Sequence, residues 1–231
     1  MINLNQDSFI VFLNKLSGRE TLEEINSRYN GKIKVVKELG KISVQAGNLT
    51  QSGGLVKKVW EKVVKSIKTA DSPKILILGL GSGTLASMLS RRNPQSFITG
   101  VDIDPKMIEI GYNYLDLSRV KNLDVVIDNA VRFIGKEKNN YDLIFVDLFH
   151  GYKAPPEIET SNFLREIINK LTPGGQIYIN RLFYTPETKA SAHSLIRILE
   201  NINLGEVSLI RSLTNLIIHF SQAGIQPSLQ V

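Results

Sequence analysis

The feature that most constrains the fold is an alternation of short apolar segments with helical segments, which begins near Lys74. The apolar segments are rich in β-branched residues and do not alternate strictly with polar ones, as is typical of strands buried on both faces. Strands that alternate with helices in this way form a parallel sheet covered by helices on both sides. The predicted strands are Ile75–Leu78, Phe97–Val101, Leu123–Ile127, Leu143–Val146 and Gln176–Ile179.

The segments between these strands have helical patterns, and a last helix is predicted from Pro186 to Asn201. Two further strands, Glu206–Arg211 and Asn215–Phe220, are separated by only three residues, which predicts an antiparallel hairpin at the sheet edge. We therefore expect an α/β fold, Rossmann-like and doubly wound, with a mostly parallel seven-stranded sheet that ends in an antiparallel hairpin. The other helices are predicted to start near Thr84, Pro105, Ala130 and Ser161.

The N-terminal part of the chain follows another pattern, and we expect residues 1–53 to form a small extension to the α/β domain of residues 54–231. A helix pair is predicted at Gln6–Leu16 and Thr21–Tyr29. A single β-hairpin is predicted next, from strands Lys32–Glu38 and Lys41–Ala46.

A further helix is predicted from Gly54 to Lys68, and Lys58, Lys62 and Lys65 fall near one of its faces at a spacing of three or four residues. One interpretation is a solvated face opposite the apolar stripe of the helix. The alternative is a footprint for nucleic acid, which the net charge of +6 permits without requiring it.

Composition excludes several classes of site. The chain has no cysteine, which rules out disulfides, thiolate zinc sites and cysteine nucleophiles, and fits a reducing compartment such as the cytoplasm. No apolar run approaches the ~20 residues that span a bilayer, so we expect no membrane partner. The first residues lack a basic region followed by an apolar one, and we expect no signal peptide there.

The sequence ILILGLGSGTLASML places Gly79, Gly81 and Gly83 between a strand and a helix. Glycines at this position allow a sharp turn and let a ligand approach the backbone closely, which predicts a nucleotide site. The dinucleotide fingerprint G-x-G-x-x-G spaces its last two glycines differently from the G-x-G-x-G found here.

Acidic and amide side chains at the ends of the next two strands are the other candidate nucleotide ligands. Asp102 ends the second strand, about twenty residues beyond the glycines, where a carboxylate accepts both ribose hydroxyls of an adenosine. The alternative for Asp102 is a helix cap, a role that Asp104 is also placed to take. After the third strand, Asn129 or Asp128 is expected to meet the adenine amino group.

Several segments between about Tyr29 and Leu182 resemble spermidine synthases and their relatives, which have the class I S-adenosylmethionine-dependent methyltransferase fold. They are NGKIKVV, NLTQSGG, GLGSGT, GVDIDPKMIEI, DNAVRFI, YDLIFVDLF and LTPGG. The resemblance implies that Gln51, Asp102 and Asn129 line a thionucleoside pocket. It also implies that Asp147, after the fourth strand, is the proton acceptor of the catalytic loop.

The chain departs from the family pattern at two positions. Ser82 stands where spermidine synthases carry an acid that holds the ammonium of decarboxylated S-adenosylmethionine. A serine donates to a carboxylate instead, which favours ordinary S-adenosylmethionine. His150 replaces the second acid of the D-x-x-D motif that faces the diamine, and with Asp147 it could form a base–orienter pair or merely cap the loop.

The remaining candidates surround the expected acceptor site. Tyr152 and the Pro155-Pro156 pair form either a rim over the acceptor or a structural crossover. Asn180 ends the fifth strand at the same edge and is a candidate acceptor ligand. We expect no metal, because Asn180 and Arg181, rather than acids, follow that strand.

These observations predict a transferase that uses S-adenosylmethionine, as methyl donor, on a small-molecule acceptor. The first alternative is aminopropyl transfer from decarboxylated S-adenosylmethionine to a polyamine. The second is a non-catalytic module that binds a nucleotide or RNA. A homodimer or the first helix pair could cover the acceptor pocket.

Overall fold

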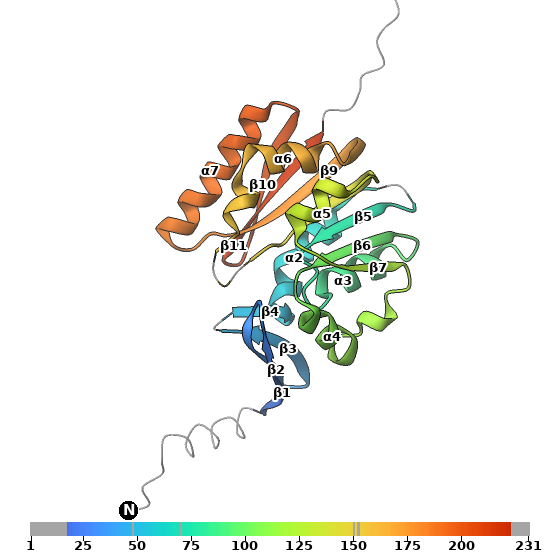
Figure 1. The fold of residues 1–231 in the computed structure, drawn as a ribbon, viewed down its shortest axis with the longest axis vertical. Coiled ribbons are helices and arrows are strands. Elements are labelled where there is room, and N and C mark those ends of the chain that lie inside the picture. The colour runs from blue at the N-terminus through green and yellow to red at the C-terminus, as the bar shows by residue number, and fades with distance from the viewer. Residues whose placement is uncertain (1–17, 48, 70, 150, 152, 223–231) are drawn as a thin grey trace, which may run out of the picture.

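The structure is a computed structural model that describes residues 18–47, 49–69, 71–149, 151 and 153–222. Its strands form two sheets, a four-stranded one with the order β1-β2-β3-β4 and a seven-stranded one with the order β10-β11-β9-β8-β5-β6-β7. Figure 1 shows the smaller sheet below the larger one, beside α4.

The larger sheet has the mostly parallel architecture that the sequence predicts. The five strands from β7 to β9 pair in parallel, and β11 pairs antiparallel with both β9 and β10. The strands are β5 (Lys74–Leu78), β6 (Phe97–Asp102), β7 (Leu123–Ile127), β8 (Tyr141–Val146), β9 (Leu171–Leu182), β10 (Gly205–Ser212) and β11 (Asn215–Gln222).

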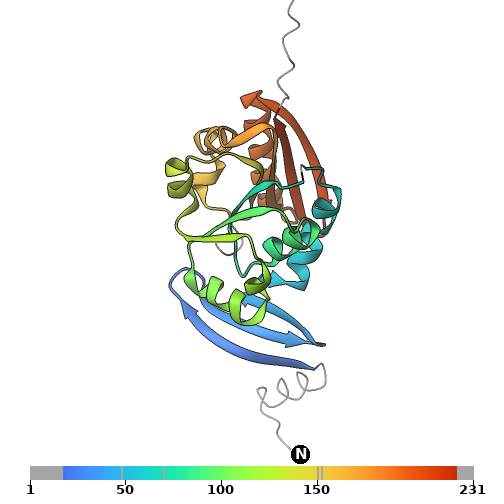
Figure 2. The same cartoon turned by 90° about the vertical axis from the view of Figure 1, so that its right-hand side faces the viewer.

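Helices cover both faces of this sheet. One apolar core joins α2 and α3 to one face, and another joins α5, α6 and α7 to the opposite face. Figure 2 shows the sheet from a second direction, with the smaller sheet again at its lower end. The helices are α2 (Gly54–Ser66), α3 (Thr84–Arg92), α4 (Pro105–Tyr114), α5 (Ala130–Lys136), α6 (Ser161–Ile168) and α7 (Pro186–Ile202), with 3-10 turns η1 (Leu117–Arg119) and η2 (Pro156–Glu159).

The predicted helix starts at Thr84, Pro105, Ala130 and Ser161 are confirmed. Side chains that precede three of them explain why. Asp104, Asn129 and Thr160 each accept a hydrogen bond from a backbone N–H in the first turn of the helix that follows. Such caps satisfy donors that the helix itself leaves without a partner.

The prediction for the N-terminal region is wrong in two respects. Residues Thr21–Tyr29 do not form a helix; Arg19–Ser27 forms strand β1, antiparallel to β2 (Gly31–Glu38). The sheet continues through β3 (Lys41–Ala46) to β4 (Leu49–Gly53), so the region forms four strands rather than one hairpin. The predicted helix Gln6–Leu16 lies outside the described residues, and the division of the chain at residue 53 stays a prediction.

The small sheet packs on α4. Val35 and Val44 share a buried cluster with Met107 and Ile110 of that helix. Since α4 follows β6 directly, this contact brings the small sheet to the carboxyl edge of the larger one. Ligands bind at this edge in open α/β sheets, at the point where the strand order reverses. Here the reversal lies between β5 and β8.

Candidate active site at the carboxyl edge of the sheet

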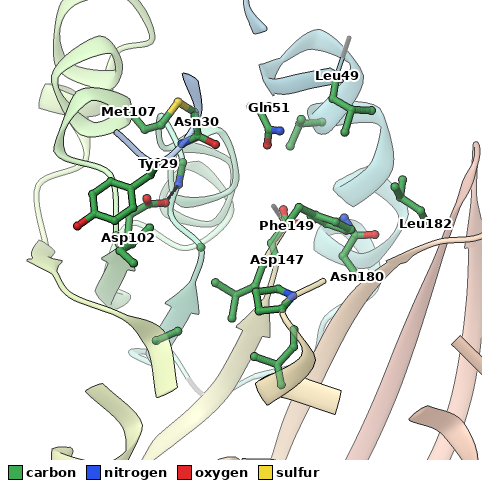
Figure 3. Close-up of a pocket in the computed structure, with 18 of the residues that line it drawn as sticks. Tyr29, Asn30, Leu49, Gln51, Asp102, Met107, Asp147, Phe149, Asn180 and Leu182 are labelled. Atoms are coloured by element: carbon green, nitrogen blue, oxygen red, sulfur yellow. Dashed lines mark hydrogen bonds between the residues drawn. The ribbon is translucent and has the colours of Figure 1, made fainter. Parts of the chain in front are cut away.

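A pocket of about 350 Å³ opens at this edge, between the larger sheet, the smaller sheet and α2 (Figure 3). The strand ends of β5, β6, β7, β8 and β9 all contribute to its lining. The predicted site residues that line it are Gln51, Gly79, Gly81, Asp102, Asp128, Asn129, Asp147 and Asn180.

The glycine loop lies between the two halves of the pocket. Gly79 has a φ of 90°, and a Cβ at this position would stand 2.3 Å from the carbonyl oxygen of Asp147. Only glycine allows β5 to turn this close to the end of β8. The loop therefore brings its backbone and the Asp147 carboxylate to the same pocket.

Asp102 lies at one end of the pocket, held by the backbone. Its two carboxylate oxygens accept hydrogen bonds from Gly81 N at 2.6 Å and from Asp104 N at 2.9 Å. Burial nevertheless raises the pKa of Asp102 to about 6, because the protein interior disfavours the charged form. The nearby Asp104 carboxylate acts in the same direction.

Asp104 fastens the small sheet over this end of the pocket. The side chain is 1% exposed and accepts hydrogen bonds from the Ser27 hydroxyl and, at 2.6 Å, from Asn30 Nδ2. It also caps α4 by accepting from Lys106 N. These contacts hold the turn between β1 and β2, so that Tyr29 and Asn30 line the pocket next to Asp102.

Asp128 and Asn129 follow β7 at the same end, and the structure gives them different tasks. The side-chain Oδ1 of Asn129 accepts from Val131 N at 3.0 Å and Arg132 N at 3.1 Å, and thus caps α5. One oxygen of Asp128, Oδ1, contacts the Arg132 guanidinium, which lowers the pKa of that carboxyl. Among the described residues, the other oxygen of Asp128, Oδ2, accepts no hydrogen bond.

Asp147 lies at the opposite end of the pocket and is held by two side chains. Trp60 Nε1 donates to Oδ2 at 2.9 Å, and Asn180 Nδ2 donates to Oδ1 at 2.8 Å. Asn180 in turn accepts from Asn215 Nδ2 at 2.9 Å, which fixes the orientation of its amide. Burial raises the pKa of Asp147, while the two hydrogen bonds oppose this shift.

The wall beside Asp147 is apolar. Figure 3 shows Leu49, Leu182 and Phe149 on the side of Asn180, away from Tyr29 and Asp102. Leu55 and Leu213 also line the pocket, and both are more than half exposed. The pocket therefore has a polar end with Asp102 and Asp128, and an end with Asp147 among leucines.

Comparison with known proteins agrees with this geometry. The family described as "Methyltransferase domain" matches residues 75–175. The chain is 29% identical over 213 residues to an eEF1A lysine and N-terminal methyltransferase homolog of Drosophila melanogaster, covering 76% of this chain and 31% of that protein. It is 28% identical over 128 residues to a probable polyamine aminopropyl transferase of Bifidobacterium longum, covering 55% of this chain and 28% of that protein.

Comparison with solved structures also finds this fold in a spermidine synthase. The crystal structure of a probable spermidine synthase from Corynebacterium glutamicum superimposes with a TM-score of 0.74, at 17% identity, over 90% of this chain and 83% of that one. In sequence the chain is thus similar to methyltransferases and to polyamine aminopropyl transferases, and it shares its fold with a spermidine synthase. It spans less than a third of the length of the two curated relatives named above.

Not all positions that the family resemblance suggested reach the pocket. Ser82 is fully buried, its N–H donates to Ser52 Oγ at 3.0 Å, and its hydroxyl has no hydrogen-bond partner in the described part of the chain. Gly83 begins α3 and packs against Leu117, where a Cβ would stand 2.2 Å from a methyl carbon. His150 and Tyr152 lie outside the described residues.

Other residues of this pocket were missed by the sequence interpretation. Tyr29 ends a segment that was predicted as a helix, and Asn30 follows it directly. Trp60 and Asn215 hold Asp147 and Asn180 from elements distant in sequence. The motif NSRYN, which stands just before the second strand, was the only available signal for the first pair.

Two further observations concern metal binding and membrane spans. Within residues 18–222, as far as the structure describes them, no three His, Asp or Glu side chains gather as metal ligands would. Among the same residues, no helix has the length and apolar character needed to cross a membrane.

Proposed function

We propose that this pocket binds S-adenosylmethionine and transfers its methyl group to an acceptor nucleophile held beside Asp147. The observation that carries the proposal is the arrangement of the pocket around the glycine loop. Asp102 lies on one side of the loop, with Asp128 N donating to its backbone carbonyl, and Asp147 with Asn180 lies on the other side. A donor that lies across the loop would have its nucleoside on the first side and its sulfonium near the second.

For the nucleoside, Asp102 would accept the ribose hydroxyls, as acids at this position do in nucleotide-binding α/β folds. Oδ2 of Asp128 is better suited to the adenine amino group than Asn129, because the side-chain Oδ1 of Asn129 already caps α5. Gln51 and the backbone of Gly79 and Gly81 would contact the rest of the donor.

For the transfer step, the acceptor lone pair attacks the methyl carbon, and the carbon–sulfur bond breaks with its electron pair going to sulfur. The donor becomes a neutral thioether, and the proton of the acceptor passes to Asp147. Such a displacement depends mainly on in-line positioning and on a deprotonated nucleophile. The raised pKa of Asp147 makes it a stronger proton acceptor than an exposed carboxylate.

Methyl transfer is proposed over aminopropyl transfer because of the wall around Asp147. A diamine acceptor carries a second ammonium, and Leu49, Leu55, Leu182 and Leu213 offer it no charge partner. Glu157 is the one carboxylate of the described lining without another role in this proposal, and it would have to provide that partner. Ser82 gives no support to this choice, since its side chain does not reach the pocket. Aminopropyl transfer remains the second candidate, and the similarity to a probable polyamine aminopropyl transferase favours it. The names of both relatives, a lysine and N-terminal methyltransferase homolog and a polyamine aminopropyl transferase, imply an amine nitrogen as acceptor.

The nucleoside product distinguishes the two reactions. The protein is incubated with S-adenosylmethionine or its decarboxylated form and a panel of amines, including putrescine and lysine peptides, and the products are identified by mass spectrometry. Methyl transfer from the carboxylated donor releases S-adenosylhomocysteine, as the proposal expects. Methylthioadenosine, released from the decarboxylated donor together with a longer polyamine, would establish the second candidate instead.

A further inference from the structure

The outer face of α2 carries a row of residues that the pocket does not use. Leu55, Lys58, Lys62 and Lys65 recur at intervals of three or four residues, and all four are exposed. In an α-helix this spacing forms one stripe, here about 15 Å long. The stripe begins at the pocket, because Leu55 is itself part of the lining.

The charge of the molecule is concentrated on this side. Helices α2 and α3, which pack together, carry six basic residues and a single acid, Glu61. Their net charge of +5 compares with +6 for the entire chain. Glu61 pairs with Lys65 at 2.8 Å, while Lys62 Nζ donates only to a backbone carbonyl, that of Arg211. The stripe thus attracts anions.

The pocket at the end of this stripe has the opposite character. Its lining, as far as the structure describes it, contains four carboxylates and no lysine, arginine or histidine. An acceptor that enters the pocket is therefore neutral or cationic, whereas whatever lies along α2 is anionic. A nucleic acid fits this combination poorly, because a base in the pocket would bring its own phosphate close to a lining that contains carboxylates and no cation among its described residues.

We propose that the stripe Leu55–Lys58–Lys62–Lys65 is a docking surface for an acidic segment of a polypeptide, which presents its acceptor group to the pocket. Acidic side chains of the segment pair with the three lysines, and an apolar residue next to them covers Leu55. A neutral or cationic side chain, or a terminal amine, then reaches Asp147. This inference rests on the proposed function only for the last step; the docking itself does not depend on it.

Binding of a labelled synthetic peptide tests the inference. The peptide has a run of about five glutamates, long enough for the stripe at ~3.3 Å per residue, followed by leucine and lysine. Its control has glutamine in place of glutamate. The protein variant carries Lys58→Gln, Lys62→Gln and Lys65→Gln together, which removes charge and keeps helix propensity. The matched control variant carries Lys37→Gln, Lys41→Gln and Lys121→Gln, three exposed lysines elsewhere.

The acidic peptide should bind the wild type at low salt and lose affinity as salt rises. The stripe variant should bind it at least tenfold more weakly, and the control variant should match the wild type. Equal binding of the two peptides, or no loss in the stripe variant, would overturn the inference. Tighter binding of polyuridylate RNA than of the peptide, lost in the stripe variant, would assign the stripe to nucleic acid instead.

A parallel titration with S-adenosylmethionine separates this inference from the proposed function. The stripe variant should bind the donor as the wild type does, because none of its three lysines lines the pocket. Donor binding without peptide binding would refute the docking surface alone. Peptide binding without donor binding would refute the proposed function alone.

Discussion

Trp60 and Asp147 are 87 residues apart in sequence, and the indole N–H of the first donates to a carboxylate oxygen of the second at 2.9 Å. Trp60 is completely buried in α2, with its ring against Phe145. Asn180 donates to the other oxygen of Asp147 from β9. Two donors from opposite sides thus fix the plane of the carboxylate, and several predictions depend on this arrangement.

The variant Trp60→Phe removes one of these donors. Because this hydrogen bond stabilises the ionised carboxylate, its loss should raise the pKa of Asp147 further. If Asp147 accepts the proton, the acidic limb of the kcat profile should move to higher pH. The profile is measured with saturating donor. Val63→Ala, which also truncates a buried α2 residue, should lower stability without moving the profile.

The variant Asp147→Asn tests the proton acceptor itself. An amide in this position turns its NH₂ toward one of two side chains that are also donors, Trp60 or Asn180, and it does not accept a proton at neutral pH. We expect kcat to fall by about 10²- to 10⁴-fold. The affinity for S-adenosylmethionine, measured by calorimetry, should change less than about threefold, since Asp102 and Asp128 are untouched. An unchanged kcat would show that Asp147 is not the acceptor.

Affinity for the donor should depend on pH through Asp102. With a pKa of about 6 in the empty pocket, this group is mostly protonated at pH 5, and only the carboxylate accepts from both ribose hydroxyls. Binding at pH 5 should therefore be about tenfold weaker than at pH 8. Asp102→Asn should bind weakly and without this pH dependence. Asp128→Asn should keep it, because the lowered pKa of Asp128 leaves that group ionised throughout.

Raising the pH should strengthen donor binding through Asp102 but lower the contribution of Asp102 to protein stability. Its folded pKa of about 6 exceeds the ordinary 3.8, so the folded state binds more protons between these values. Its contribution to the free energy of unfolding therefore falls as pH rises through this window. Asp102→Asn should stabilise the protein at pH 8 by about 1–2 kcal/mol. The gain should shrink toward pH 4, and a thermal unfolding series across pH that shows a constant gain would contradict this account.

Gly79→Ala should be severe. The new methyl group would meet the Asp147 carbonyl at 2.3 Å on a backbone with φ of 90°, so both the loop and Asp147 must move. We expect a loss of at least ~2 kcal/mol in stability and no measurable transfer. Gly135→Ala in α5, where a Cβ meets nothing within 4 Å, should instead stabilise by about 1 kcal/mol. Denaturant unfolding of the pair provides the comparison.

Much of the fold could be predicted because its signals are local. Helix starts follow capping side chains such as Asp104 and Thr160, and buried strands stand out as β-branched runs. Strand β1 could not be predicted, since its sequence RETLEEINS is composed mostly of good helix formers. It is a strand because of its pairing with β2 and the packing of Leu22 and Ile25 against the small-sheet core.

The candidate site was predictable where a strand end delivers the residue. Asp102, Asp128 and Asp147 each follow a parallel strand, and such ends meet at one edge of the sheet. The contacts of Trp60 could not be predicted, because they depend on how α2 packs across the sheet. The buried position of Ser82 could not be predicted either, because it depends on the packing of Ser52 against the glycine loop.

Calorimetric titration with S-adenosylmethionine, its decarboxylated form and methylthioadenosine is the most direct test of the central claim. The account predicts that S-adenosylmethionine binds more tightly than the decarboxylated form, and that Asp102→Asn weakens the binding of all three. Preference for the decarboxylated donor would favour aminopropyl transfer. Binding of none of them would contradict the assignment of this pocket as a donor site.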